Sequence, residues 1–336
     1  SNEMVGKSEY RKRLVLQESA KNICGYVYTS SGVHESTTDL VFGGDCIICE
    51  NGILLSSAKR FGREDTIIYG EIDVERLKFE RAQGQTFSQG TNIYTKREMY
   101  QHIKLSELSM LRENDCMERK YPEMPFVPTD KDIINERCEE IFNIQSAGLA
   151  KRIEHTGLSK MILGISGGLD STLALLVCIE TCFLLGISTE NIIAVTMPGF
   201  GTTDKTYNNA LSLMKLLNTQ SREIPIEKAV MQHFEDIGHN PNVHDVIFEN
   251  AQARERTQIL MDIANKENGL VIGTGDLSET ALGWATYNGD HMSMYAVNIS
   301  IPKTLVRFII EWVMKHKFED SNFKNILQDI LDTPIS

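Results

Sequence analysis

Residues Lys160–Val177, KMILGISGGLDSTLALLV, carry the strongest indication of the fold of this chain. Its apolar start, Met161–Ile165, is typical of a buried parallel strand, and a glycine-rich turn and an apolar helix that opens at Asp170 follow it. The N–H groups of a helix's first turn have no intrahelical partners and carry the positive end of the helix dipole. A strand, a glycine turn and a helix N-terminus therefore predict an anion site. The plain alternative is a turn between two core elements, with serine and aspartate as the helix cap.

The composition of this turn narrows the chemistry. It has no lysine at the GxxxxGK[ST] spacing, where a lysine would bind the β- and γ-phosphates of a nucleotide. Asp170 stands in the turn instead, and its carboxylate would repel phosphate unless Mg²⁺ lay between them. The pattern SGGxDS therefore predicts pyrophosphate held by Mg²⁺ and backbone amides, with chemistry at the α-phosphate.

The composition predicts a soluble globular protein of one large or two ordinary domains, with 336 residues, 41% of them hydrophobic and 24% charged. The net charge of −12 argues against nucleic acid or an anionic membrane as a partner. No run approaches the roughly 18 apolar residues that a membrane span needs. Seven scattered cysteines, an odd number, predict reduced thiols and a cytoplasmic location.

The first part of the chain, residues 1–87, predicts helices beside a small sheet. The expected helices cover residues 8–23 and 75–81, and the expected strands cover 25–30, 45–49, 53–57 and 66–74. The Asn51-Gly52 pair between apolar runs favours a type I′ hairpin turn. Residues 88–128 are charged and then rich in proline, which predicts a connecting segment, partly helical, between two domains.

The second part, residues 129–336, alternates strands and helices. The expected strands cover 161–165, 191–197, 222–226 and 270–274, and the expected helices cover 130–148, 170–185, 204–217, 229–235 and 250–267. This alternation predicts right-handed βαβ units and an α/β fold with a mostly parallel sheet. The motifs SGGLDS, MPGFGTTD and GTGDLSE each follow a strand, so three loops should meet at the sheet edge where ligands bind.

Two carboxylates on these loops are the candidate metal ligands. Asp170 and Glu279 would each stand at a strand end, and Mg²⁺ prefers one or two carboxylates together with phosphate oxygens and water. The alternative for Glu279 is an exposed acid that helps Asp276 and Ser278 to cap a helix. Thr274 offers a hydroxyl for an ATP ribose or phosphate, or is an ordinary residue at the end of a strand.

The strand–SGGxDST–helix element resembles the PP-loop of ATP pyrophosphatases, which implies adenylation of a substrate with release of pyrophosphate. Three further stretches resemble the NAD synthetases within that group: NAQARER (250–256), GTGDLSETALGWATYNGDHMS (273–293) and NISIPKTLVR (298–307). The resemblance implies a Rossmann-like PP-loop domain that uses ATP and Mg²⁺ to convert deamido-NAD to NAD. In that reaction the nicotinate carboxylate attacks the α-phosphorus, and ammonia then displaces AMP.

The resemblance also implies the binding residues. For ATP they are Gly164, Ile165, Ser166, Gly167, Gly168, Leu169, Asp170, Ser171, Thr274 and Lys303. For deamido-NAD they are Asn250, Glu279, Trp284, Ala285, Thr286 and Tyr287. The alternative for Lys303 is a solvated lysine before a helix, and Trp284 is as consistent with core packing as with a ligand contact.

Residues 1–87 resemble the C-terminal part of the nitrilase-type amidase domain, an α-β-β-α sandwich, that is fused to glutamine-dependent NAD synthetases. The matching motifs are SNE (1–3), YVYTSSG (26–32), ESTTDLVFGGD (35–45) and ENG (50–52). The resemblance implies glutamine contacts at Ser1 and Lys7 and ammonia supplied from glutamine. The family's Glu, Lys and Cys lie upstream of this match, and none of the chain's cysteines stands at the nucleophile's position. We therefore expect a chain cut at both ends that is inactive with glutamine, and a homo-oligomer.

Two alternatives remain open on the sequence. The first is another PP-loop amidotransferase, such as a GMP synthetase, which would use xanthosine monophosphate in place of deamido-NAD. The second is a non-catalytic module that senses ATP through SGGLDS, which would bind ATP without releasing pyrophosphate.

Overall fold

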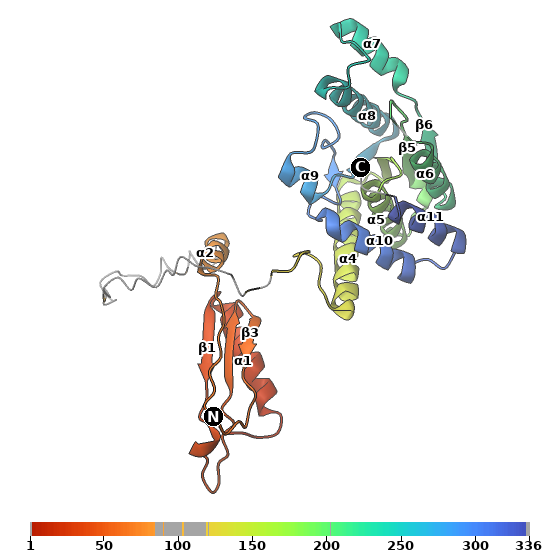
Figure 1. Ribbon diagram of the computed structural model, residues 1–336. Coiled ribbons are helices and arrows are strands. Elements are labelled where there is room, and N and C mark those ends of the chain that lie inside the picture. The colour runs from red at the N-terminus through yellow and green to blue at the C-terminus, as the bar shows by residue number, and fades with distance from the viewer. Residues whose placement is uncertain are drawn as a thin grey trace. The chain divides into compact units, whose positions relative to one another are not determined.

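The computed structural model describes residues 2–84, 90, 103, 119, 121–201 and 203–333. It divides into two compact units, Ser1–Tyr121 and Pro122–Ser336 (Figure 1). Most of the connecting segment expected at 88–128 lies outside the described residues, so the three-part division of the chain stays a prediction. Within the described ranges, no helix is both long enough and apolar enough to cross a membrane.

The first unit packs helix α1 (Lys7–Lys21) against an antiparallel sheet of order β1-β2-β3. Its strands are β1 (Gly25–Thr29), β2 (Cys46–Glu50) and β3 (Ile53–Ser57), and a short 3₁₀ helix, η1 (Val33–Glu35), follows β1. Val15 of α1 packs with Ile47 and Cys49 on one face of the sheet. The predicted type I′ turn is confirmed, because Asn51 and Gly52 have φ angles of 44° and 81°.

The strand expected over residues 66–74 is wrong. This stretch pairs with no strand and crosses the face of the sheet that carries Ile48. A Cβ on Gly70 would lie 3.1 Å from a methyl group of Ile48, and one on Gly25 would lie 2.6 Å from Ile72. The β-branched residues that predicted a strand therefore cover a sheet face instead of extending the sheet. Helix α2 (Val74–Gln83) follows.

The second unit is built on a five-stranded parallel sheet of order β6-β5-β4-β7-β8. The strands are β4 (Lys160–Gly164), β5 (Ile192–Thr196), β6 (Gln220–Glu223), β7 (Gly269–Gly273) and β8 (Tyr295–Ala296). The helices are α4 (Lys131–Thr156), α5 (Leu169–Leu185), α6 (Asp204–Leu216), α7 (Glu227–Ile237), α8 (Val246–Glu267), α9 (Leu277–Leu282), α10 (Lys303–His316) and α11 (Ser321–Leu331), with a 3₁₀ helix, η3 (Thr189–Asn191). The predicted parallel α/β fold is confirmed.

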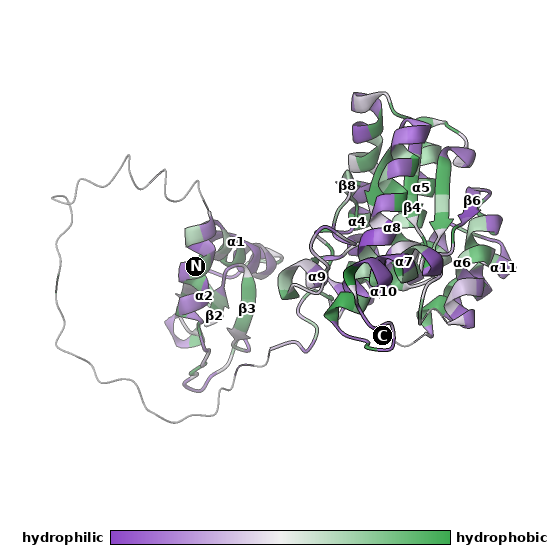
Figure 2. Cartoon of the chain, turned by 90° about the horizontal axis from the view of Figure 1, so that it is seen from above, coloured by the Kyte–Doolittle hydropathy of each residue, from purple (hydrophilic) through white to green (hydrophobic). Residues whose placement is uncertain are grey.

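Helices cover both faces of this sheet because its central strands, β4, β5 and β7, are apolar on both sides. Met161 and Leu163 of β4 point into a core shared with α4, α5, α10 and α11. Ile162 points the other way, into a second core shared with α7 and α8. In Figure 2 the central strands are accordingly green, and the helices around them carry both green and purple residues.

Several predicted element boundaries differ from the structure, and two of the differences have identifiable reasons. Helix α4 does not stop at Gly148 but continues to Thr156 and ends at Gly157, whose φ is 69°. Gly148 stays inside the helix because its missing Cβ makes room for the hydroxyl of Tyr295, which would lie 2.6 Å from that Cβ. Strand β6 begins two residues earlier than expected, and the fully buried Ile226 caps the start of α7 instead.

The strand order changes direction between β4 and β7. From β4 the chain moves outward through β5 to β6, and it then returns to β7 on the other side of β4. Ligands of open parallel sheets bind in the crevice beyond the carboxyl ends of the strands at such a switch point. The SGGLDS turn after β4 and the GTGD loop after β7 stand on its two sides.

Candidate active site

The glycine turn after β4 is shaped by contact with helix α6. Gly167 has a φ of 81°, and a Cβ there would lie 2.1 Å from the carbonyl oxygen of Thr206. Only glycine fits both the conformation and the space. Gly168 then caps α5 without a side chain, so the first turn of α5 has no side-chain cap. An anion at this position would meet N–H groups that the helix itself leaves without partners.

Serine hydroxyls hold the shape of the turn from within. The Ser171 hydroxyl accepts from the Ser166 amide at 3.3 Å and donates to the Gly168 carbonyl at 3.2 Å. The Ser166 hydroxyl accepts from the Gly168 amide at 3.3 Å, and the Thr172 hydroxyl donates to the Gly168 carbonyl at 2.8 Å. The turn is therefore organised before any ligand binds, which reduces the conformational cost of binding.

Three carboxylates and one ammonium gather at the switch point, and we call this group the acidic centre: Asp170, Asp276, Glu279 and Lys303. Asp170 lies in the first turn of α5, Asp276 and Glu279 flank the start of α9, and Lys303 begins α10. One oxygen from each of the three carboxylates lies within 4.8 Å of the others. Lys303 Nζ donates to Asp170 Oδ2 and lies 3.5 Å from Asp276 Oδ2 and 3.9 Å from Glu279 Oε1.

The acidic centre carries an excess of negative charge in a partly buried place. Burial, followed by repulsion from neighbouring carboxylates, raises the pKa of Glu279. Burial also raises the pKa of Asp170, although the hydrogen bond from Lys303 acts against it. For Lys303 burial lowers the pKa, but its carboxylate neighbours outweigh burial and the net pKa is raised. One ammonium thus partly balances three acids.

The donor set fits Mg²⁺. Asp170 Oδ1 and Asp276 Oδ2 are buried oxygens without a hydrogen-bond partner, and a buried acceptor left without a partner costs free energy. Carboxylate oxygens on separate loops are the ligands that Mg²⁺ accepts in nucleotide sites, together with phosphate oxygens and water. The predicted pair of Asp170 and Glu279 is therefore brought together, as the sequence predicted.

Asp276 is a member of the acidic centre that the sequence analysis treated only as a helix cap. It does cap α9, because Asp276 Oδ1 accepts from the Glu279 amide at 2.8 Å while the Glu279 carboxylate accepts from the Asp276 amide at 3.2 Å. Its other oxygen, Oδ2, faces Lys303 in a fully buried position. A signal was present in the sequence, since Asp276 follows the same predicted strand as Thr274.

Four of the six residues expected to contact deamido-NAD, Trp284–Tyr287, lie in a segment after α9, whereas Asn250 lies in α8 and Glu279 in α9. Thr286 Oγ1 donates to Asn250 Oδ1 at 2.8 Å, which joins two of the predicted residues from α8 and the segment. Arg254 of α8 donates to the carbonyl of Tyr287 at 3.1 Å. The Trp284 and Tyr287 side chains are 76% and 75% exposed. They are therefore not core residues, and their rings are available to a ligand.

The remaining predicted residues divide by burial. Ile165 and Leu169 are buried in the core, so only their backbone groups can face a ligand, and Gly164 is packed closely by Met197 and Leu260. In the first unit, Lys7 Nζ donates to Asn2 Oδ1 at 2.7 Å. Ser1 lies outside the described residues.

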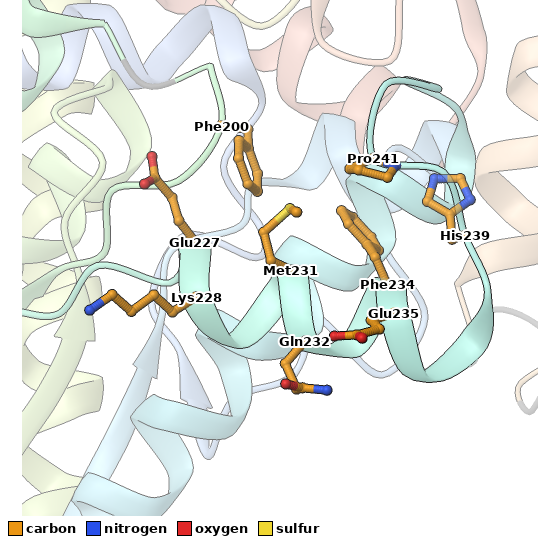
Figure 3. A pocket seen from close by; sticks show the side chains of 9 residues that line it. All are labelled: Phe200, Glu227, Lys228, Met231, Gln232, Phe234, Glu235, His239 and Pro241. Carbon is orange, nitrogen blue, oxygen red and sulfur yellow. The ribbon is translucent and has the colours of Figure 1, made fainter.

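A groove of about 680 Å³ lies on α7 and the loops beside it (Figure 3). Phe200, Met231, Phe234 and Pro241 give it an apolar floor, and charged side chains of α7 stand at its margin. None of its nine lining residues is among the predicted site residues. The groove is therefore a different feature from the acidic centre.

A parallel sheet with a glycine turn at its switch point, a carboxylate in place of the phosphate-binding lysine, and an acidic centre beside it defines a nucleotide-binding domain of the PP-loop class. The family model described as NAD synthase matches residues 141–314, more than half of the chain. The chain therefore belongs to the NAD synthase family, and the resemblance found in its sequence is confirmed.

Similar proteins agree with this assignment. The chain is 38% identical over 344 residues to the glutamine-dependent NAD(+) synthetase of Mycobacterium tuberculosis (strain ATCC 25618 / H37Rv), covering 99% of this chain and 50% of that protein. It is 31% identical to the protein of the same name from Thermotoga maritima, covering 82% of this chain and 44% of the relative. The chain thus spans about half the length of the curated relatives it matches.

The fold has a counterpart among solved structures. The glutamine-dependent NAD+ synthetase of Acinetobacter baumannii, solved in complex with ADP, aligns with a TM-score of 0.54 and 22% identity. The alignment covers 100% of this chain and 53% of that one. Membership of the NAD synthase family does not favour the GMP synthetase alternative.

Proposed function

We propose that this chain carries the synthetase site of an enzyme that amidates deamido-NAD to NAD at the expense of ATP. The observation that carries this proposal is the acidic centre at the switch point, beside a glycine turn without a phosphate-binding lysine. Such a site suits a nucleotide whose β- and γ-phosphates leave together as pyrophosphate. Membership of the NAD synthase family and the names of the relatives support it.

The proposed reaction has two steps. An oxygen of the nicotinate carboxylate attacks the α-phosphorus of ATP, and the bond from that phosphorus to the bridging oxygen breaks, releasing pyrophosphate. Ammonia then attacks the adenylated carbonyl carbon, the bond to AMP breaks, and a proton from the nitrogen passes to solvent. Neither step needs a nucleophilic side chain, so the protein acts by positioning the reactants and balancing their charge.

The residues divide these tasks. The first-turn amides of α5 and the Gly167-Gly168 turn would receive the departing pyrophosphate. Asp170, Asp276 and Glu279 would hold Mg²⁺, which neutralises phosphate charge when bound. Lys303 would then be free to leave Asp170 and face the phosphate oxygens, supplying the positive charge that the missing loop lysine does not.

The exposed segment after α9 suits the second nucleotide. Trp284 and Tyr287 offer ring faces on which a base can stack, and such stacking contributes about 1–3 kcal/mol per base. Asn250 and Thr286 offer polar groups beside them. The acidic centre would thus bind ATP, and the segment after α9 with Trp284 and Tyr287 would bind deamido-NAD.

The whole enzyme would obtain ammonia from glutamine. The first unit would supply part of the glutamine site through Ser1 and Lys7, with the domain division 1–87, 88–128 and 129–336 expected from the sequence. We also propose that the enzyme is cytoplasmic and forms a homo-oligomer. The homo-oligomer is proposed because close contacts have to keep ammonia from bulk solvent as it passes between sites.

The test is an assay of pyrophosphate and AMP formed from deamido-NAD, ATP, Mg²⁺ and ammonium by the purified chain. Formation of AMP, pyrophosphate and NAD in equal amounts would support the proposal. Binding of ATP with no pyrophosphate from any partner would favour the sensing module, and turnover with xanthosine monophosphate would favour a GMP synthetase. A second assay replaces ammonium with glutamine, and turnover there would contradict the expectation that this chain is inactive with glutamine.

A further inference from the structure

Asn298 lies where the two loops of the proposed site meet. It follows β8, is fully buried, and donates from Nδ2 to two carbonyl oxygens, that of Asp170 at 2.9 Å and that of Thr274 at 3.0 Å. The first carbonyl belongs to the opening turn of α5 and the second to the residue directly after β7. One side-chain amide therefore joins the loop of the glycine turn to the loop of Asp276 and Glu279.

This link stands where the sheet no longer holds the two loops together. The paired residues of β4 and β7 end at Ile162 and Val271, before either loop begins. Beyond that point β4 and β7 have no paired residues. At the site, the Asn298 amide connects the two loops, as backbone hydrogen bonds connect β4 and β7 nearer the start of the strands.

Gln145 on α4 determines which way the Asn298 amide faces. Gln145 Nε2 donates to Asn298 Oδ1 at 3.0 Å and to the Val297 carbonyl at 2.9 Å. Because Gln145 presents a donor, the oxygen of Asn298 has to face it, and the Nδ2 group has to face the two loops. Both side chains are buried, so water does not substitute readily for either bond.

We propose that Asn298, oriented by Gln145, is a positioning residue that sets the spacing of the acidic centre for the adenylation step. Like charges repel, and Asp170, Asp276 and Glu279 have to stay within reach of one cation despite that repulsion. Lys303 opposes the repulsion at the side chains, and Asn298 holds the backbones that carry Asp170 and Thr274. This inference rests on the proposed function.

The test compares Asn298→Ala with Thr181→Val. Thr181 is also fully buried, and its hydroxyl donates to the carbonyls of Val177 and Ser146 without touching either loop. Both variants lose a buried hydrogen-bonding side chain, so both should lower the melting temperature. Only Asn298→Ala should lower kcat for pyrophosphate release, by roughly a hundredfold, because displacement of reacting groups by about 1 Å costs that much.

Two further readouts separate positioning from general loosening. The KM for deamido-NAD should stay within about twofold for Asn298→Ala, because the proposed contacts of deamido-NAD other than Glu279 lie on α8 and in the segment after α9. The Mg²⁺ concentration for half-maximal rate should rise about tenfold. Gln145→Met keeps the two bonds from Asn298 to the loops and removes the donor to Asn298 Oδ1 and to the Val297 carbonyl, so it should lose less activity than Asn298→Ala, roughly tenfold.

The inference and the proposed function can fail separately. If the parent chain forms no pyrophosphate, the proposed function fails, and the positioning role is then judged by calorimetric affinity for ATP with Mg²⁺, which should weaken about tenfold in Asn298→Ala and not in Thr181→Val. If the parent is active and the kcat of Asn298→Ala equals that of Thr181→Val, the positioning role is overturned. An unchanged Mg²⁺ dependence in an active Asn298→Ala variant would overturn it equally.

Discussion

The two ends of the parallel sheet treat charge in opposite ways. Where β4 and β7 begin, Glu267 at the end of α8 lies 2.5 Å from Lys160 Nζ and 2.6 Å from Arg222 Nη2. Hydrogen bonds from these two cations lower the pKa of Glu267 to about 2. At the other end, three carboxylates share Lys303, and the pKa values of Asp170 and Glu279 are raised. One end has two cations for one acid, and the other has one cation for three.

The difference shows which end is complete by itself. Both carboxylate oxygens of Glu267 have a cation beside them, so nothing remains for a ligand to supply. The acidic centre keeps buried oxygens without a hydrogen-bond partner on Asp170 and Asp276. Its arrangement is costly to the isolated chain and would be relieved by a bound cation, as expected where stability is exchanged for activity.

The largest effect is expected at Asp170. We expect Asp170→Asn to lower the rate of pyrophosphate release by at least about a hundredfold. The substitution removes the carboxylate charge that would hold a cation against the phosphates. The melting temperature should not fall, since the substitution removes a buried charge whose pKa is raised. Assay of pyrophosphate and a thermal melt of the same sample check both parts. A variant of normal activity would remove the acidic centre from the proposed mechanism.

The second prediction removes the only cation of the acidic centre. Lys303→Met should destabilise the metal-free chain by about 1–2 kcal/mol, less than for a fully buried pair because the Lys303 side chain is 27% exposed. Added Mg²⁺ should restore more stability to this variant than to the parent, because the metal replaces the lost positive charge. Chemical unfolding with and without Mg²⁺ measures both. Equal Mg²⁺ effects on variant and parent would contradict this.

The third prediction is the matched change at the other end. Glu267→Gln should lower the melting temperature, because Lys160 and Arg222 lose their acid, and should leave kcat and KM unchanged. Folding lowers the pKa of Glu267 in the parent chain, so the stability that the ionised carboxylate contributes is fully present above the ordinary pKa of 4.5. That stability is lost as the pH falls towards about 2. Acid unfolding curves of parent and variant should converge in this range.

The smallest effect is the pH dependence of the acidic centre. Asp170 and Glu279 have raised pKa values, so the folded chain keeps protons that the unfolded chain releases. The stability of the metal-free chain should therefore fall as the pH rises from the ordinary pKa values of these two groups, 3.8 and 4.5, through their raised values. This dependence has the opposite sign to that of Glu267. Stabilisation by Mg²⁺ should grow over the same window, since the metal binds ionised carboxylates. Melts from about pH 4 to 8 measure both trends, and Glu279→Gln should flatten them.

The sequence predicted most of the second unit because its signals are local. An apolar run, a glycine turn and a cap pattern depend on neighbours along the chain, and so do the strand ends that carry Asp170 and Glu279. The wrong predictions concern contacts between distant residues. Residues 66–74 had the composition of a strand, but they pack over the sheet face that carries Ile48 and against Gly25. Gly148 was predicted to end a helix, but it lies within α4, where the Tyr295 hydroxyl occupies the space that a Cβ would take.

The class of site could be predicted from a PP-loop turn, an adjoining acidic loop and the NAD synthase motifs, because each is a pattern of consecutive residues. Tertiary structure alone decided how the acids share a charge and what holds them together. The second role of Asp276, the ion pair of Lys303 with Asp170, and the bonds from Asn298 to two loops join residues 24 to 133 positions apart. Such contacts depend on the strand order, which brings β7 back beside β4 and which no local pattern encodes.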